Sequence, residues 1–202
     1  MKRIRGFTLI ELMMAVAIVA VLAAVATTSY IRYMRRARTQ EAVSMLGDIR
    51  IRQEIYFQTN SRYACSDATC GCSGGAWFPN SPDPTDPGSD LPVAAPPLFC
   101  NSASAGSAEA AWCELGLDPN GEFYFKYMFQ GWDGQAGSVA NDCSGVNTCT
   151  NAWDTNCFQL DRNRPWWFAV AHGNLDGDPH MMLSTFYISS STKQVLTFNE
   201  ID

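Results

Sequence analysis

The sequence predicts an α+β protein in which one long amino-terminal hydrophobic helix packs against a carboxyl-terminal antiparallel sheet. Three patterns support this fold class: an apolar run over residues 7–26, a helical repeat of apolar residues up to residue 58, and alternation of polar and apolar residues over 123–129. A repeat of three to four residues is typical of a helix with one buried face, and a repeat of two is typical of a strand. The 202 residues are enough for one such helix and one globular head.

The first 26 residues predict a membrane anchor. A basic leader, residues 1–6, precedes twenty residues that are apolar except for Thr8 and Glu11. At about 1.5 Å per residue these twenty make a helix of about 30 Å, which matches the hydrocarbon core of a bilayer. The leader predicts a cytoplasmic amino end. An ionised carboxylate near the bilayer centre costs about 2.5–3.5 kcal/mol, so Glu11 needs a partner or a function.

One octet of this segment resembles the amino-terminal signature of type IV pilins and type II secretion pseudopilins, most closely that of type IVa major pilins: Gly6-Phe7-Thr8-Leu9-Ile10-Glu11-Leu12-Met13. The resemblance implies that a prepilin peptidase cleaves between Gly6 and Phe7 and methylates the new amino terminus. It also implies that Glu11 meets the amino terminus of a neighbouring subunit during assembly, which would offset the desolvation of both charges. The alternative for Glu11 is an acid at a helix start, where the helix dipole favours negative charge.

These patterns divide the chain into four segments. Residues 1–6 are the expected leader, and residues 7–58 the expected helix, of which 7–26 are predicted to cross the membrane. The resemblance implies that residues 7–26 then form the filament core. Residues 59–122 are a loop region rich in cysteine, proline and glycine, and residues 123–202 are the sheet of the head. The pilin resemblance implies the same long helix and the type IV pilin fold.

The helix should continue beyond the membrane, because apolar residues recur every three to four positions: Tyr30, Tyr33, Met34, Ala37, Leu46, Ile49 and Tyr56. Many type IVa pilins carry a proline where this chain has Thr28. Without a proline, local unwinding of the helix is less assured, although Thr27, Thr28 and Ser29 could weaken its hydrogen bonds.

Charge is distributed unevenly. Residues 27–63 hold seven arginines against three acidic residues, whereas residues 64–202 carry four basic and sixteen acidic residues. A head with a net charge of −12 would repel phosphate, so direct nucleic-acid binding is not expected. Arg32, Arg35, Arg36 and Arg38 compete with the leader under the positive-inside rule, and the cysteines favour an exported head.

All eight cysteines lie after residue 64: Cys65, Cys70, Cys72, Cys100, Cys113, Cys143, Cys149 and Cys157. An even number in an exported domain predicts disulfides rather than a metal cluster, since no histidine is near the first three and no C-x-x-C occurs. Eight cysteines allow 105 connectivities. We expect Cys100 and Cys113 to form one bridge, and Cys70 not to pair with Cys72 because closure over two residues strains the geometry.

The last eighty residues predict strands at Phe123–Phe129, Trp166–Ala171, Thr185–Ser189 and Gln194–Phe198, the last two joined as a hairpin. The first of these presents one strongly apolar face. Most aromatic residues are expected to fill the core.

One loop could carry a metal site. Asn174, Asp176 and Asp178 alternate around Gly177, which would turn hard oxygen ligands to one side, as calcium requires. The alternative is an Asp/Gly turn whose side chains cap backbone amides. Calcium is therefore a possible cofactor, and no other is indicated.

No catalytic motif accompanies the two histidines, His172 and His180, so an enzyme is not expected. The resemblance implies a structural subunit of a type IV pilus, the major one, which forms a homopolymer and meets the inner membrane, prepilin peptidase and the pilus assembly machinery. The precursor would lie in the bacterial inner membrane and the product in a cell-surface filament. Two alternatives stay open: a pseudopilin or minor pilin of a secretion or DNA-uptake machine, and a membrane-tethered binding protein.

Overall fold

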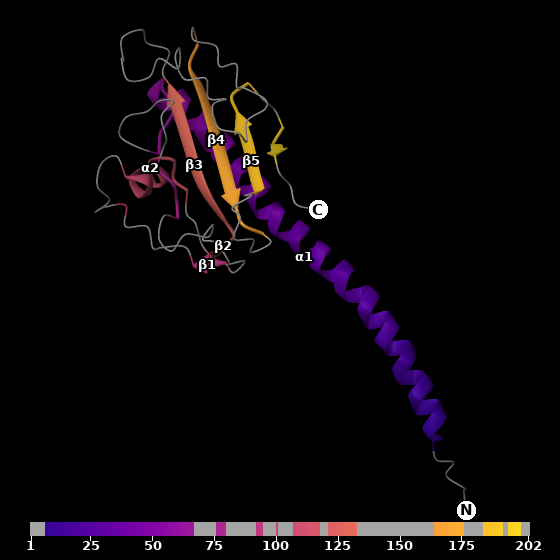
Figure 1. Ribbon diagram of the computed structural model, residues 1–202. Coiled ribbons are helices and arrows are strands. Elements are labelled where there is room, and N and C mark those ends of the chain that lie inside the picture. Colours follow the sequence, from indigo (N-terminus) through magenta and orange to yellow (C-terminus); the bar gives the residue numbers. More distant parts are fainter. Residues whose placement is uncertain are drawn as a thin grey trace, which may run out of the picture. The chain divides into compact units, whose positions relative to one another are not determined.

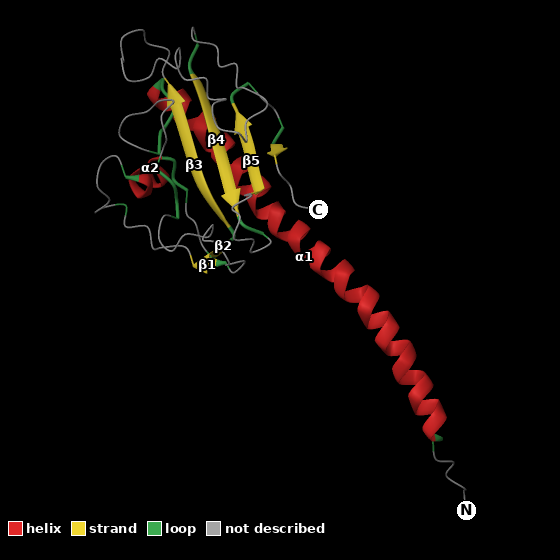
Figure 2. Ribbon diagram, viewed as in Figure 1, coloured by secondary structure: helices red, strands yellow, loops and turns green. Residues whose placement is uncertain are grey.

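The computed structural model describes residues 7–66, 76–79, 92–94, 100, 107–117, 121–132, 164–175, 184–191 and 194–198. Figure 1 shows the elements, which are α1 (Leu9–Asn60), β1 (Val93–Ala94), α2 (Ala108–Glu114), β2 (Glu122–Phe123), β3 (Phe125–Trp132), β4 (Trp166–Gly173), β5 (Ser184–Ser189) and β6 (Leu196–Phe198). One long amino-terminal helix and a carboxyl-terminal antiparallel sheet confirm the predicted α+β class (Figure 2).

The chain divides into two compact units, Met1–Ala37 and Arg38–Ile201. We call the first the amino-terminal unit and the second the head. Helix α1 contributes residues to both units.

Helix α1 is continuous through the position where many pilins have proline. The hydroxyls of Thr27, Thr28 and Ser29 donate to carbonyls three or four residues earlier, at 2.8–3.3 Å, and the helix is not interrupted. The helix ends where Ser61 adopts a left-handed backbone (φ 55°) and its N–H donates to the Phe57 carbonyl at 2.8 Å. The predicted end at residue 58 was two residues short.

The main sheet has the strand order β3-β4-β5-β6, and every neighbouring pair is antiparallel. The free edge of β3 is covered by two segments, because the Ser66 N–H donates to the Phe129 carbonyl and Phe78 pairs with Tyr127. Gly131 permits this close approach, since a Cβ there would lie 2.5 Å from the Tyr63 Cβ.

The predicted strand Phe123–Phe129 is wrong as a single element. It is divided at Tyr124 into β2, which pairs with β1 in a separate two-stranded sheet, and β3, which runs on to Trp132. The physical reason is a competing acceptor: the Tyr124 N–H donates to Glu41 Oε2 of α1 at 2.9 Å. The other predicted strands are present, with β4 extended to Gly173 and β6 shortened to Leu196–Phe198.

The carboxyl-terminal part of α1 lies across one face of this sheet (Figure 1). The core between them combines aliphatic residues of the helix with aromatic residues of the strands: Ala42, Leu46, Ile49, Phe125, Tyr127, Phe129, Trp167, Phe186 and Ile188. Full burial of one large apolar side chain contributes about 1.5–3 kcal/mol. Gln53 is buried too, and it exchanges two hydrogen bonds with the backbone of Ala64, at 2.9 and 3.0 Å.

The opposite face of the sheet is also buried. Met128, Trp166, Phe168, Val170 and Tyr187 form a second cluster, with Trp77 packed against it. The sequence predicted one strongly apolar face for the strand at Phe123–Phe129, and Met128 lies on the other face of that strand, which it shares with Lys126. The second cluster draws its other members from neighbouring strands.

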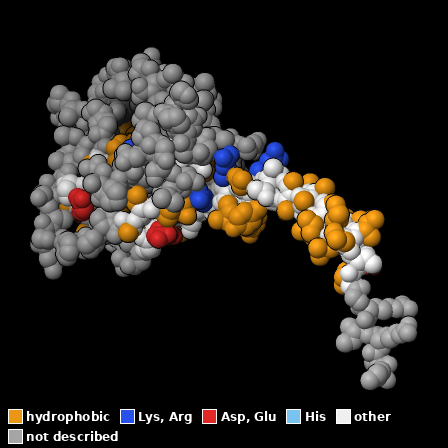
Figure 3. Space-filling model, turned by 60° about the horizontal axis from the view of Figure 1, so that its bottom comes forward, with side chains coloured by type: hydrophobic (Ala, Val, Ile, Leu, Met, Phe, Trp, Pro, Cys, Tyr) orange, Lys and Arg blue, Asp and Glu red, His pale blue; other side chains and the backbone are white. Residues whose placement is uncertain are grey.

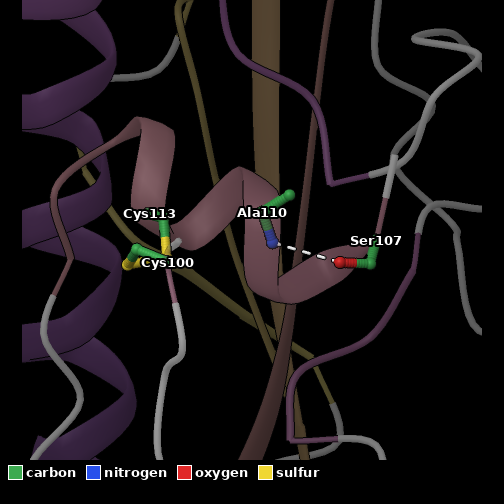
Figure 4. Close-up of a disulfide and its surroundings, with 4 residues drawn as sticks. All are labelled: Cys100, Ser107, Ala110 and Cys113. Carbon is green, nitrogen blue, oxygen red and sulfur yellow. Dashed lines mark hydrogen bonds between the residues drawn. A yellow bond between two sulfur atoms is a disulfide. The ribbon is translucent and has the colours of Figure 1, made fainter. Parts of the chain in front are cut away.

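The region predicted as loop, residues 59–122, contains a helix and a short strand. Helix α2 begins at Ser107, whose hydroxyl accepts a hydrogen bond from the Ala110 N–H at 3.2 Å (Figure 4). Its last turn carries Cys113, which is bonded to Cys100 (Figure 4). The Arg52 guanidinium of α1 donates to the Leu115 carbonyl at 3.1 Å and holds the end of α2.

Candidate functional site

The residues of the amino-terminal signature lie in the first turn of α1. Thr8 precedes the first helical residue, Leu9. Its backbone N–H and its hydroxyl donate to Glu11 Oε2 at 3.0 and 2.8 Å, and the Glu11 N–H donates to Thr8 Oγ1 at 3.3 Å. This reciprocal arrangement is a capping box, which satisfies backbone donors that the first turn leaves without helical partners.

Glu11 therefore has a local role at the helix start, as its alternative interpretation held. Both Thr8 donors bind Oε2. A carboxylate has about four acceptor positions, so capping leaves room for a further donor such as an amine. Gly6, the residue before the expected cleavage point, lies outside the described residues, and Phe7 is 85% exposed.

The surface of the amino-terminal unit from Phe7 to Val25 is largely apolar and exposed. Large side chains from Phe7 to Val25 are all exposed, and apolar atoms cover this part of the helix, followed by basic side chains (Figure 3). Helix α1 is long and apolar enough to cross a membrane. Exposed apolar surface of this extent requires lipid or other apolar helices.

A second carboxylate of α1, Glu41, lies in the head and is largely buried. Tyr124 N–H and Tyr127 O–H donate to its two oxygens, each at 2.9 Å. Burial raises the pKa of Glu41 above 4.5, and the bonds from Tyr124 and Tyr127 counteract that rise. Burial also raises the pKa of Tyr127, with the Glu41 charge as a further cause. The Arg38 guanidinium lies 4.5 Å from the centre of the Tyr124 ring.

These contacts hold α1 to the start of the sheet. Sequence analysis missed Glu41, because its partners are 83 and 86 residues away and no local pattern marks them. It also missed the role of Thr8, although Thr-x-x-Glu before an apolar run is a recognised signal for a capping box.

The cysteines in the described part of the chain are all in disulfides. The structure has the expected Cys100–Cys113 bridge, and Cys65 is also disulfide-bonded. The remaining five lie outside the described residues: Cys70, Cys72, Cys143, Cys149 and Cys157. Their pairing stays a prediction.

The suggested calcium loop is only partly described. Asn174 is buried directly after β4, whereas Asp176 and Asp178 lie outside the described residues. Within the described ranges, no group of three His, Cys, Asp or Glu residues could hold a metal. Calcium binding therefore stays a prediction.

His172 packs in an aromatic and cationic cluster on the face of the sheet opposite α1. Its ring stacks on Trp77 with centroids 4.5 Å apart, and Lys126 Nζ lies 5.5 Å from the same indole. Lys126 and His172 are direct cross-strand partners. Their packing gives His172 a structural role, and His180 lies outside the described residues.

Two comparisons with known proteins bear on this capped apolar helix and its α+β head. The model of the prokaryotic N-terminal methylation motif matches residues 1–27. The chain is also 49% identical over 72 residues to the type IV pilus subunit protein TapA of Aeromonas hydrophila. That region is 35% of this chain and 51% of TapA, so the match spans about half the length of the relative. No solved structure matches significantly.

The chain therefore carries the prokaryotic N-terminal methylation motif in residues 1–27 and is similar, over about a third of its length, to a type IV pilus subunit protein.

Proposed function

We propose that this chain is the major structural subunit of an extracellular type IV pilus. The observation that carries the proposal is the exposed apolar surface of α1, with its capped start inside a methylation motif. Such a surface is stable in the inner membrane before assembly and against the same helices of other copies afterwards. The name of TapA, a type IV pilus subunit protein, supports this reading.

In this proposal, prepilin peptidase removes residues 1–6 and methylates Phe7. Residues 7–26 then leave the membrane and form the filament core, residues 27–58 support the head, and residues 59–202 face the outside. In this scheme the filament is a homopolymer of this chain, built by the pilus assembly machinery.

Glu11 has two tasks in this scheme. It caps its own helix through Thr8, and it attracts the charged amine of a neighbouring Phe7. The amine and the carboxylate are both costly in an apolar environment, and pairing offsets that cost. Removal of one member of a buried charge pair costs about 3–5 kcal/mol, so loss of this contact in every subunit should suppress fibre growth.

Three variants separate the two tasks in cells that assemble the fibres. Glu11→Ala removes cap and charge, Glu11→Gln keeps an acceptor for the Thr8 N–H but removes the charge, and Thr8→Ala weakens the cap but keeps the charge. We expect both Glu11 variants to accumulate in the inner membrane with few sheared fibres, and Thr8→Ala to assemble. Normal fibre yield from Glu11→Gln, together with loss of fibres in Thr8→Ala, would show that Glu11 acts only as a helix cap.

The mass of subunits from native sheared fibres tests the proposal as a whole. The mature chain should begin at Phe7 with one added methyl group, and this chain should be the dominant component. Met1 in assembled fibres would contradict the processing step. A trace amount in fibres made mainly of another subunit would instead favour a minor pilin or pseudopilin.

A further inference from the structure

The part of α1 that belongs to the head has a face that lies outside the core formed by the described residues. Residues spaced by three or four positions form it, and we call them the Ile51 face: Ser44, Gly47, Asp48, Ile51 and Ile55. This spacing places them on one side of the helix. The buried residues Leu46 and Ile49 lie on the other side, against the sheet.

Two large aliphatic side chains are exposed on this face. Ile51 is 61% exposed and Ile55 is 57% exposed, and they lie one helical turn apart. Single exposed apolar residues are common on protein surfaces, whereas an adjacent pair on a helix forms a ridge that another helix can cover.

Gly47 makes a notch beside this ridge. A glycine destabilises a helix interior relative to alanine, so its presence calls for a reason. Apart from the adjacent residues and the nearby helix backbone, no described residue has an atom within 4 Å of a Cβ built at Gly47. The described part of the head therefore leaves room for a side chain at this position. A partner helix that packs closely against α1 would require a residue as small as glycine at position 47, because the distance between two helices depends on the side chains at their contact.

We propose that the Ile51 face binds α1 of a second copy at residues 30–36, which we call the arginine segment. The inference rests on the proposed function and assigns the residues of one contact between subunits.

Charge and polarity favour this occupant. The arginine segment carries Arg32, Arg35 and Arg36, and its Tyr30, Ile31 and Tyr33 are exposed. Its aromatic and aliphatic side chains cover Ile51 and Ile55, while its guanidinium groups lie near the exposed Asp48. Opposite charges at the rim of a contact give it register more than affinity.

The geometry of such a contact suits a filament. The Ile51 face and the arginine segment are different surfaces of the same helix, so each copy offers one to each of two neighbours. Head-to-tail contacts of this kind do not close a dimer and continue as an open helical polymer, unless the rotation closes a ring.

The first experiment compares sheared fibre yield with the melting temperature of the full-length chain in detergent. Gly47→Ala and Gly47→Leu should both keep or raise the melting temperature, because nothing crowds the site. Fibre yield should fall with side-chain size, by at least about tenfold for Gly47→Leu, the change that a loss of about 1.4 kcal/mol produces. Ile51→Ser should lower the yield similarly, and the volume-conserving control Ile51→Leu should not.

If Gly47 serves only to let the helix bend, Gly47→Ala and Gly47→Leu will lower the yield equally and Ile51→Ser will not lower it. That pattern overturns the inference. A wild-type fibre yield from Gly47→Leu also overturns the inference. The proposed function survives that result, because the fibres still form from this chain. If the wild type forms no fibres of this chain, the proposed function fails instead.

The second experiment identifies the occupant. A photo-crosslinking amino acid in place of Ile51, in assembled fibres, should yield a product of twice the subunit mass whose attached peptide contains residues 30–36. Attachment to lipid, to another protein or to a different segment of the chain would overturn the assignment.

Discussion

The two parts of α1 share one backbone conformation and differ in what surrounds it. From Leu9 to Ala37 almost every side chain is exposed, and from Arg38 to Asn60 one face is buried under the sheet. The side chains of the first part have few contacts with the described residues of the chain, so stabilising contacts for them must come from their surroundings. The side chains of the second part pack against the sheet of the head. Helical structure by itself therefore does not show where the stabilising contacts of a helix lie.

The two carboxylates on this helix repeat the contrast. Glu11 accepts its hydrogen bonds from Thr8, three residues away, and Glu41 accepts its bonds from Tyr124 and Tyr127 of the sheet. A local partner makes Glu11 part of the helix start. Distant partners make Glu41 part of the tertiary structure.

The largest expected effect tests the comparison directly. Leu46→Ala removes a completely buried side chain and should lower the free energy of unfolding of the head by about 2–5 kcal/mol. Leu22→Ala makes the same chemical change on the exposed part of α1 and should alter it by less than about 0.5 kcal/mol. Denaturant unfolding of the full-length chain in detergent, followed by tryptophan fluorescence, measures both. Equal effects would show that the two parts are stabilised together.

Alanine substitutions at two glycines should change the free energy of unfolding by smaller amounts and in opposite directions. Gly131→Ala places a Cβ 2.5 Å from the Tyr63 Cβ and should destabilise the head by about 1–3 kcal/mol. Gly47→Ala meets no such obstacle within the described residues and should stabilise it by about 0.5–1 kcal/mol. The same unfolding assay applies. A stabilising Gly131→Ala would mean that the segment at Tyr63 does not pack tightly on β3.

The smallest effect concerns pH. Because burial raises the pKa of Glu41 above 4.5, the folded head binds this proton more tightly than the unfolded chain does. The resulting stabilisation is complete below pH 4.5 and is lost as the pH rises through the folded-state pKa. Stability of the wild type should therefore fall relative to Glu41→Gln as the pH is raised from 4.5 toward neutrality.

Melting curves over that range measure the difference, with the exposed Asp48→Asn as the control. Parallel pH profiles for the wild type and Glu41→Gln would show that burial does not govern the titration of Glu41.

Local patterns in the sequence were sufficient for much of this protein. The apolar run and the repeat after it predicted α1 to within two residues at its carboxyl end, because helical periodicity is a property of neighbouring residues. Alternation over Phe123–Phe129 predicted most of β3 for the same reason, although that segment is divided at Tyr124. The octet at Gly6–Met13 was enough to indicate the methylation motif, since this motif is linear in the sequence.

Tertiary structure decided what depends on residues distant in the sequence. Glu41 takes the Tyr124 N–H and thereby divides one predicted strand into β2 and β3. Helix α2 forms in a stretch whose composition predicted loop, where Trp112 enters the core. The free energy of these contacts comes from groups that meet only after the chain has folded, so no local pattern contains them.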